Sequence, residues 1–427
     1  MLLRHVERAV TRPPLEMLAD GCAPATFRAA AAAIAAVAGS ASGTIMWRAL
    51  LQGRSMPSSL FTTIGLRDLT LANRIVVSPM CQYSADDGSA TDWHMQHLGS
   101  LAVSGAGLLM VEATAVEQAG RITHGCLGLY SDANEAALGR VVAACRRFGN
   151  TALGLQLAHA GRKGSAHRPW EGIRPLSQEE GAWVTVAPSP IALDEDWPTP
   201  RALTAADLDR IEAAFVAATR RAARLGLDLV EAHCAHGYLL HEFLSPIANK
   251  RDDAYGGSLE NRMRFPLRVM AAMRAAWPAK KPLGARITGT DWLPGGFSIE
   301  DAVVFARALK AIGCDYVCVS SGGIVPKAPI PVAPGYQLDL AARVRRDAGI
   351  AARAVGLLVE PHQAEAVIAS GQADMVAMAR AFLDDPRWPW HAAEVLGARA
   401  AYPPQYERSR ADLWAGAKLA RPLRAAK

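Results

Sequence analysis

Cysteine is scarce in this sequence, which carries seven cysteines in 427 residues. Their odd number and wide spacing do not fit a disulfide-stapled scaffold, and they favour reduced thiols and a cytoplasmic location. Only Cys314 and Cys318 lie close together, in an apolar run with no further cysteine or histidine at ligand spacing. We therefore predict no metal site.

A strong excess of one charge is also lacking. The chain holds 46 Lys and Arg residues against 40 Asp and Glu residues, a formal net charge of +6. No basic run is interleaved with aromatic residues, so we predict no nucleic-acid interface. The Ala-rich stretch at residues 29–38 is shorter than the ~20 residues that span a bilayer, so we predict no membrane segment. With 51% hydrophobic and 20% charged residues, the chain can bury a large core.

Residues 1–55 differ in composition from the rest of the chain. A secretory signal is one interpretation of the Ala-rich stretch, but that stretch begins far from the terminus and behind several acidic residues. We favour a weakly ordered N-terminal extension, with Met56 as an alternative start. Residues 409–427, rich in Ala, Arg and Lys, are predicted to form a C-terminal tail. Residues 56–408 then form one folded domain.

Eight short apolar runs, rich in Val, Ile, Leu and Ala, alternate with stretches of helical periodicity. Near-continuous apolar runs indicate strands that are buried on both faces, as in a parallel sheet. Eight strand–helix repeats predict an α/β fold closed into a (β/α)8 TIM barrel, with an open doubly wound sheet as the alternative. The Gly-rich turn that the open sheet needs after its first strand is absent. The runs span residues 74–80, 107–116, 152–159, 227–234, 282–288, 316–323, 351–358 and 375–380.

Helix starts are marked by side chains that can accept hydrogen bonds from the first turn. The residues 207–225 also carry apolar side chains at helical spacing, which predicts a helix with one face on the core. The marked pairs are Thr204 with Asp207, Ser258 with Asn261 and Ser298 with Asp301.

Polar residues gather at the C-terminal ends of the apolar runs, where TIM barrels carry their functional groups. Such groups need a shared ligand or a solvent-filled mouth to satisfy them. The polar residues are residues 78–83, Glu112, Gln156, His159, His233, His236, Arg286, residues 320–323 and Arg380.

Five segments at these strand ends resemble the Old Yellow Enzyme family in order, spacing and placement. They are Ser78-Pro79-Met80-Cys81-Gln82-Tyr83, the Glu-Ala-Thr-Ala-Val of residues 112–116, the Gln-Leu-Ala-His-Ala-Gly-Arg-Lys of residues 156–163, the segment 233–246 beginning His-Cys-Ala-His-Gly-Tyr, and residues 251–262. The resemblance covers roughly residues 60–408. The Cys after Ser-Pro-Met, with Tyr two residues on, is similar to the YqjM-like bacterial class. The family resemblance implies that the chain binds FMN non-covalently, that NADPH or NADH reduces the flavin, and that the substrate is a small-molecule activated alkene.

The resemblance also implies which residues bind the flavin. Arg286 would stabilise negative charge on the reduced flavin, because a guanidinium keeps its proton at working pH; a salt bridge at the barrel mouth is the alternative role. Gln156 can donate and accept at once, which suits the pyrimidine edge of the ring. Ser78, Pro79, Met80 and Cys81 would approach the ring near N5, with Ala113 allowing close contact from the next strand. Cys81 would tune the flavin rather than act as a nucleophile, although a lone Cys on a strand is more often a small core side chain.

Phosphate binding is expected from the loops after the seventh and eighth strands. Gly356 and Arg380 are the candidates, because an Arg gives a charge-assisted fork to a phosphate. Ala379 stands where the family often has Gly, so its backbone contact with the phosphate would be tighter.

The substrate is expected to meet two histidines and two tyrosines. Two imidazole donors from His233 and His236 at one carbonyl oxygen would stabilise the charge that develops as hydride arrives. The resemblance implies that Tyr238 supplies the α-proton and that Tyr83 lines the pocket. A His-x-x-His pair could also be a zinc fragment or two surface histidines, and either tyrosine could simply pack.

The segment ending at Arg408 resembles the C-terminal end of the bacterial class, in which an Arg reaches the neighbouring subunit's site. This implies a homodimer or homotetramer with Arg408 acting in trans, although this chain continues 19 residues beyond it. A flavin-free TIM-barrel lyase or isomerase remains the alternative function. It would need a Schiff-base lysine or an acid–base pair at the strand ends.

Overall fold

The structure is a computed structural model that describes residues 57–420. The predicted extension at residues 1–55 and the last seven residues of the predicted tail lie outside the described residues. The six cysteines within the described part are free thiols.

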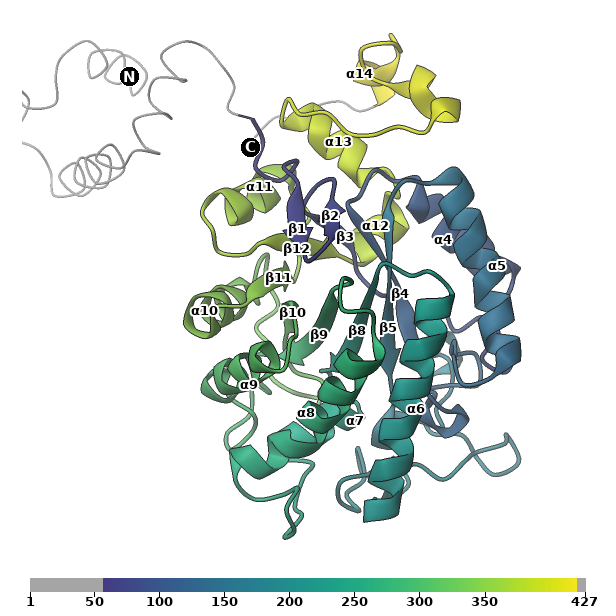
Figure 1. Cartoon of the computed structure of the whole chain (residues 1–427), viewed down its shortest axis with the longest axis vertical. Helices are drawn as coiled ribbons and strands as arrows, with labels where there is room; N and C mark the ends of the chain where they lie inside the picture. The colour runs from purple at the N-terminus through teal and green to yellow at the C-terminus, as the bar shows by residue number, and fades with distance from the viewer. Residues whose placement is uncertain (1–56, 421–427) are drawn as a thin grey trace, which may run out of the picture. The chain divides into compact units, whose positions relative to one another are not determined.

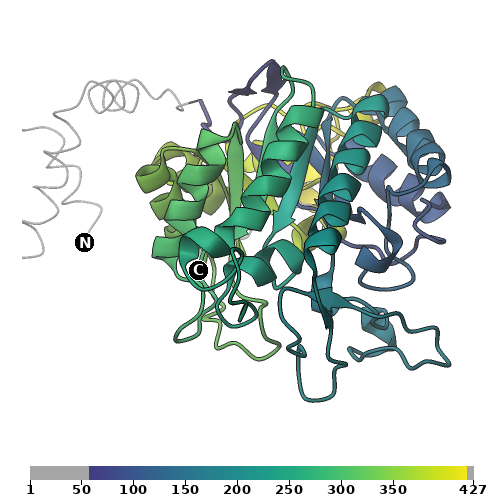
Figure 2. The same ribbon diagram turned by 60° about the horizontal axis from the view of Figure 1, so that its bottom comes forward.

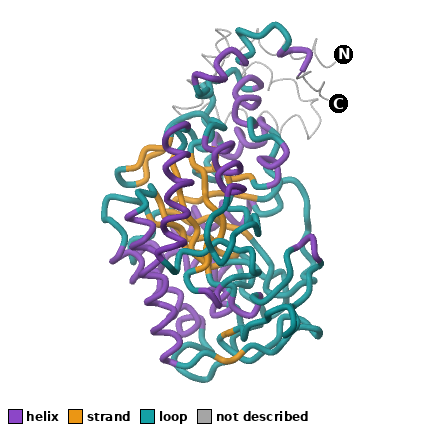
Figure 3. The backbone as a smooth tube through the Cα atoms, turned by 90° about the vertical axis from the view of Figure 1, so that its right-hand side faces the viewer, coloured by secondary structure: helices purple, strands orange, loops and turns teal. Residues whose placement is uncertain are grey.

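Eight parallel strands close into a barrel. Figure 3 draws the strands in orange, most of them at the centre of the fold. The chain enters the strands in sequence, and the last strand pairs with the first. The predicted TIM barrel is thereby confirmed, and the open doubly wound sheet is wrong because the sheet has no edge. The strands are β3 (Ile75–Val77), β4 (Leu108–Ala115), β5 (Ala152–Ala158), β8 (Leu229–Cys234), β9 (Leu283–Thr288), β10 (Tyr316–Ser320), β11 (Ala351–Val355) and β12 (Met375–Met378).

Helices surround the barrel and connect successive strands (Figure 1). Those that follow or link the strands are α4 (Asp92–Ala102), α5 (Asp132–Phe148), α6 (Ala205–Arg224), α7 (Leu239–Leu244), α8 (Leu259–Ala276), α9 (Ile299–Ala311), α10 (Leu338–Ala348), α11 (Pro361–Ala369) and α12 (Arg380–Asp384). The chain continues into α13 (Trp388–Val395) and α14 (Ala417–Ala420). In the described part of the chain, no helix combines the length and the apolar character needed to cross a bilayer.

The three predicted helix starts are confirmed. The side chains of Thr204, Ser258 and Ser298 each accept a hydrogen bond from the backbone N–H three residues later. The predicted apolar stripe of α6 is buried against the barrel through Leu208, Ile211, Phe215, Ala218 and Ala222. The helix is therefore held by a capped first turn and a continuous core-facing side.

The two ends of the barrel differ. A hairpin of β1 (Ile64–Leu66) and β2 (Leu69–Leu71) precedes β3 and packs Leu66 and Leu71 into an apolar cluster. This cluster includes the first residues of four barrel strands, Leu108, Leu229, Tyr316 and Met375. At the C-terminal ends, long loops extend from the barrel, the longest being residues 159–204 between β5 and α6 (Figure 2). That loop carries a short pair of strands, β6 (Val186–Ala187) and β7 (Arg201–Ala202).

A polar layer lies inside the barrel, below its mouth. Arg353 of β11 and Glu231 of β8 are both 0% exposed, and Arg353 Nη2 lies 2.5 Å from Glu231 Oε2. The Tyr316 hydroxyl donates to the same carboxylate at 2.6 Å, and Gln156 Nε2 donates to its other oxygen at 2.8 Å. Gly284 has no Cβ, which leaves the space that the Tyr316 ring fills. Glu231 is therefore fully satisfied at the cost of burying a charge pair.

Replacing Arg353 with Met should destabilise the protein by about 3–5 kcal/mol, because Glu231 would remain as a buried charge without its partner. The measurement is guanidinium unfolding of the FMN-loaded protein. The double change Glu231→Gln, Arg353→Met should regain most of the loss. Lys280→Met, which removes the exposed Lys280–Asp68 pair, is the control and should cost at most about 1 kcal/mol. An Arg353→Met protein as stable as this control would contradict the prediction.

Candidate active site

The turn after β3 carries the predicted segment Ser78–Tyr83 to the barrel mouth. Ser78 N–H donates to Met378 O of β12 at 2.9 Å, and the buried Ser78 Oγ has no hydrogen-bond partner in the described part of the protein. The Gln82 N–H donates to Glu112 Oε2 at 3.1 Å. Tyr83 adopts a left-handed backbone with φ of 51°. The turn is therefore held at both ends and leaves a buried hydroxyl available to a ligand.

Glu112 links this turn to β4. The register of β4 on β5 shifts between Val111 and Ala113, so Glu112 is the extra residue of a bulge and Ala113 pairs with Gln156. Burial raises the pKa of Glu112. Burial, together with the nearby Glu112 carboxylate, raises the pKa of Cys81 well above its usual value. Cys81 stays a neutral thiol, which fits a role other than nucleophile.

Arg286 and His233 are direct neighbours across the pairing of β9 and β8. Arg286 makes no hydrogen bond or ion pair with a described residue, and its Nε is buried without a partner. The guanidinium group is part-buried, and its buried Nε needs a hydrogen-bond acceptor, so it is suited to an anionic or carbonyl-bearing ligand. Gln156 of β5 pairs with Glu231, two residues before His233 on β8. The Gln156 amide nitrogen donates to the Glu231 carboxylate, which leaves the Gln156 amide oxygen as a free acceptor.

His233 and His236 lie together at the end of β8. His236 Nδ1 is 3.3 Å from His233 Nε2, and the ring centroids are 5.0 Å apart. Burial and the neighbouring Arg286 guanidinium lower the pKa of both imidazoles well below the usual value. Both rings are therefore neutral near pH 7, when each can offer one N–H.

Tyr238 stands directly beside these imidazoles. Its ring centroid is 4.8 Å from that of His233, and burial raises its pKa well above the usual value. Tyr83 reaches the mouth from β3 and packs edge-on against Trp170 at 6.0 Å. Burial also raises the pKa of Tyr83 above its usual value, so both predicted tyrosines carry protonated hydroxyls.

Lys163 is a site residue that the sequence reasoning assigned no role. Its Nζ donates to His236 O at 2.9 Å and to Gly323 O at 3.1 Å, and lies 5.0 Å from the centroid of the Tyr238 ring. Burial lowers its pKa to about 8. Its place at the end of the Gln-Leu-Ala-His-Ala-Gly-Arg-Lys segment was the only signal for it, because its contacts come from segments far along the chain.

The predicted phosphate residues follow β11 and β12. Gly356 has a φ of 124°, which disfavours a side chain, and a Cβ there would meet Gln337 Nε2 at 2.8 Å. Ala379 is the N-cap residue of α12, and Arg380 is its first residue. Arg380 makes no hydrogen bond or ion pair within residues 57–420. Gly356 and Arg380 therefore follow two neighbouring strands, and the Arg380 guanidinium, which has no partner of its own, could bind a phosphate group.

Arg408 is not brought into this cluster by contacts within one chain. It lies exposed in the short helix η4 (Pro404–Ser409) and has no hydrogen bond or ion pair to a described residue. The residues at the barrel mouth, by contrast, fit FMN: Arg286 on β9 and Ser78 after β3 offer donors without a partner, and Arg380 offers another after β12.

Residues 59–398 match the NADH:flavin oxidoreductase / NADH oxidase family. The chain belongs to this family. It is 44% identical to an NADPH dehydrogenase of Geobacillus thermodenitrificans over 355 residues, 83% of this chain and 99% of that protein. It is 43% identical to an NADPH dehydrogenase of Listeria monocytogenes over 354 residues, 82% of this chain and 99% of that protein. A solved structure of morphinone reductase superposes with a TM-score of 0.67 at 28% identity, covering 82% of this chain and 93% of that one.

Family membership confirms the resemblance to the Old Yellow Enzymes. This member of the family is an NAD(P)H-dependent flavin oxidoreductase that binds FMN. The flavin-free lyase or isomerase considered from the sequence is therefore excluded as its main function.

Arg380→Ala should weaken FMN binding by about 10- to 100-fold, because a charge-assisted hydrogen bond contributes about 1.5–3 kcal/mol. The measurement is quenching of flavin fluorescence when the apoprotein is titrated with FMN. Riboflavin, which lacks the phosphate, should bind the variant and the parent protein equally. Equal weakening of FMN and riboflavin would place the effect elsewhere.

Proposed function

We propose that this flavin oxidoreductase is an ene-reductase, acting on a small-molecule alkene conjugated to a carbonyl or a similar acceptor group. The observation that carries the proposal is the pair of neutral imidazoles, His233 and His236, whose facing nitrogens are 3.3 Å apart beside Arg286. When bound and reduced by NADPH or NADH, FMN supplies a hydride to the β-carbon of such an alkene.

The hydrogen bonds around the two histidines support two donors aimed at one oxygen. His233 Nδ1 accepts from the Ala235 N–H at 3.3 Å, so the ring proton is on Nε2. His236 Nε2 lies 2.5 Å from Ser320 Oγ; when the Ser320 hydroxyl donates to this nitrogen rather than to Gln337 Oε1, the His236 proton is on Nδ1. A ligand oxygen that accepts from both rings then replaces the direct contact between His236 Nδ1 and His233 Nε2. A carbonyl oxygen between them is stabilised as negative charge develops on it.

Tyr238 is the proposed donor of the proton that the α-carbon takes up. Its hydroxyl makes no hydrogen bond to another described residue, and it stands beside His233. The raised pKa keeps the proton on the hydroxyl until a carbanion-like centre forms. The Lys163 ammonium group near the ring favours the tyrosinate that remains.

The proposed flavin contacts divide between the ring and the phosphate. Arg286 and Gln156 would hold the pyrimidine edge, and the backbone of residues 78–81 with Ala113 would approach the ring near N5. Cys81 adjusts the reactivity of the ring as a neutral thiol. Gly356, Ala379 and Arg380 hold the phosphate.

Tyr238→Phe should slow oxidation of the reduced enzyme by 2-cyclohexenone by about 10²- to 10⁴-fold, the usual range for losing a general acid. Stopped-flow absorbance of the flavin measures this step, and reduction by NADPH should be unchanged. A benzoquinone acceptor is the control, because its oxygens take up the protons and no α-carbon is protonated. Equal slowing with both acceptors would remove Tyr238 from its proposed role.

We also propose that the enzyme is a homodimer or homotetramer in which Arg408 enters the neighbouring subunit's site. Its exposed position and lack of partners within its own chain support this. Arg408→Ala should raise the KM for the enone several-fold without changing the oligomeric state. Arg346→Ala, which removes the exposed Arg346–Asp347 pair, is the control. Unchanged flavin and enone binding in Arg408→Ala would contradict the role in trans.

A further inference from the structure

The turn that carries His236 has an unusual backbone. His236 and Gly237 adopt φ angles of 60° and 72°, both in the left-handed region. For a residue with a side chain, this conformation costs of order 1–3 kcal/mol and persists only where surrounding contacts impose it. A Cβ at Gly237 would also collide with the backbone of Gly323. The position of His236 therefore depends on what holds this turn.

His241 of α7 holds this turn in place through a hydrogen bond with its backbone. Its Nδ1 accepts a hydrogen bond from the Gly237 N–H at 2.8 Å. Since Nδ1 is the acceptor, the proton of the neutral ring is on Nε2. That nitrogen lies 3.2 Å from Asp291 Oδ1, and both side chains are 0% exposed. The N–H does not point straight at the oxygen, so this contact is mainly electrostatic.

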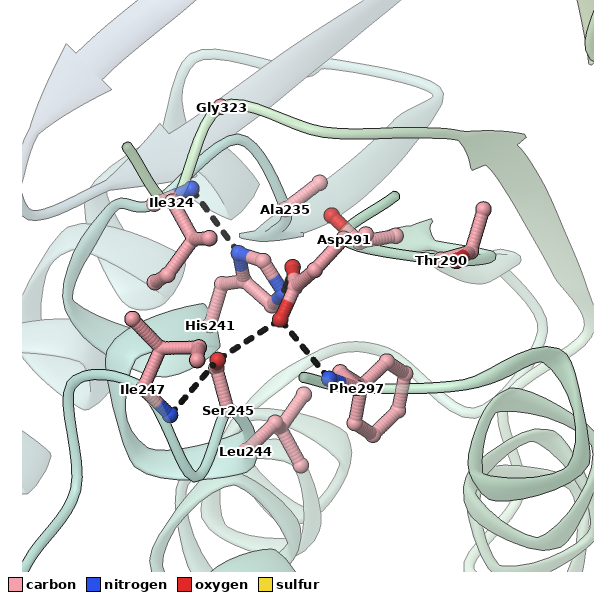
Figure 4. Close-up of polar contacts among 12 residues, drawn as sticks. Ala235, His241, Leu244, Ser245, Ile247, Thr290, Asp291, Phe297, Gly323 and Ile324 are labelled. Atoms are coloured by element: carbon pink, nitrogen blue, oxygen red, sulfur yellow. Dashed lines mark hydrogen bonds and ion pairs between the residues drawn. The ribbon is translucent and has the colours of Figure 1, made fainter. Parts of the chain in front are cut away.

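Asp291, in the loop after β9, is itself fixed in orientation. Its Oδ2 accepts from Ser245 Oγ at 2.6 Å and from the Phe297 N–H at 2.8 Å (Figure 4). These two donors occupy Oδ2 and leave Oδ1 to face His241. Burial alone would raise the pKa of Asp291, but the neighbouring His241 and the hydrogen bonds to the carboxylate hold it below its usual value.

We propose that Asp291 and His241 are positioning residues for the substrate anchor: Asp291 selects the His241 tautomer that accepts from Gly237, and this bond fixes His236 opposite His233. The inference rests on the proposed function. Neither residue touches substrate or flavin, so their effect should fall on affinity for the enone carbonyl and leave the reaction of NADPH with the flavin unchanged.

The first test compares two replacements of His241 in the FMN-loaded enzyme. In His241→Asn, the amide oxygen can take the place of Nδ1 and accept from Gly237. In His241→Ala, the buried Gly237 N–H loses its acceptor, which should weaken 2-cyclohexenone binding about ten-fold. His241→Asn should stay within about two-fold of the parent enzyme.

The second test is Asp291→Asn, which leaves the volume of the side chain nearly unchanged. Ser245 and Phe297 both donate, so they retain the amide oxygen at the Oδ2 position, and the new NH2 faces His241 Nε2. The His241 proton must then move to Nδ1, where it opposes the Gly237 N–H. We expect about ten-fold weaker enone binding. In the His241→Asn background, Asp291→Asn should add little, because no ring tautomer remains to be selected.

Two readouts separate positioning from general damage. The dissociation constant for 2-cyclohexenone is taken from the absorbance change of oxidised FMN in the holoenzyme, and the KM and kcat from turnover with NADPH. FMN content, thermal unfolding and the rate of reduction by NADPH should match the parent in Asp291→Asn and His241→Asn. His391→Ala, which removes the part-exposed His391–Asp385 pair, is the matched control and should bind the enone normally.

The outcomes distinguish this inference from the proposed function. The inference is supported if affinity for the enone is similar in the parent enzyme and His241→Asn and lower in Asp291→Asn and His241→Ala. This holds even if turnover is absent and the ene-reductase proposal fails. Equal enone affinity in the parent and in Asp291→Asn overturns the inference while leaving ene-reductase activity intact. The inference is also overturned if the variants that bind the enone more weakly lose FMN, or lose reduction by NADPH, to the same extent. Absence of enone binding in the parent enzyme overturns both.

Discussion

The pairing of β8 with β9 is the constraint on which the site depends. It sets His233 opposite Arg286, with both side chains on the inner side of a closed sheet. Two residues earlier along β8, Glu231 points into the same interior and meets Arg353. A register shift of one residue would turn all of these groups outward to the helices. The closed barrel prevents such a slip because each strand is paired on both sides.

Buried histidine–carboxylate pairs recur around the barrel mouth. In each, Nδ1 accepts from a backbone N–H and Nε2 faces a carboxylate, so a neutral ring carries its proton on Nε2. The three pairs are His94 with Glu112, His159 with Glu117, and His241 with Asp291, and their backbone donors are Thr91, Gly161 and Gly237. Loops at the end of a barrel have few neighbours to hold them. These pairs give three of them a fixed attachment to the rigid part of the fold.

The division between ligand-facing and supporting groups is visible in their hydrogen bonds. Arg286 and Arg380 have no partners among the described residues, whereas Arg353, Lys163 and the three histidines of the pairs each make at least one hydrogen bond within the protein, although Arg353 Nε, His94 Nε2 and His241 Nε2 have no hydrogen-bond partner. The two guanidinium groups that we propose to bind the flavin have no partners, and the groups behind them have partners within the protein.

The sequence by itself determined the barrel, because strand burial on both faces and helix periodicity are local patterns that repeat eight times. It also placed His233, His236, Arg286 and Gln156 at strand ends, since a side chain near the end of a run needs no knowledge of distant segments. Only the tertiary structure decided which distant partners meet: Arg353 with Glu231, Lys163 with the backbone of His236, and Asp291 with His241. Those contacts join residues 50 to 122 positions apart, and a single sequence carries no signal of which of its many charged groups will share one buried layer.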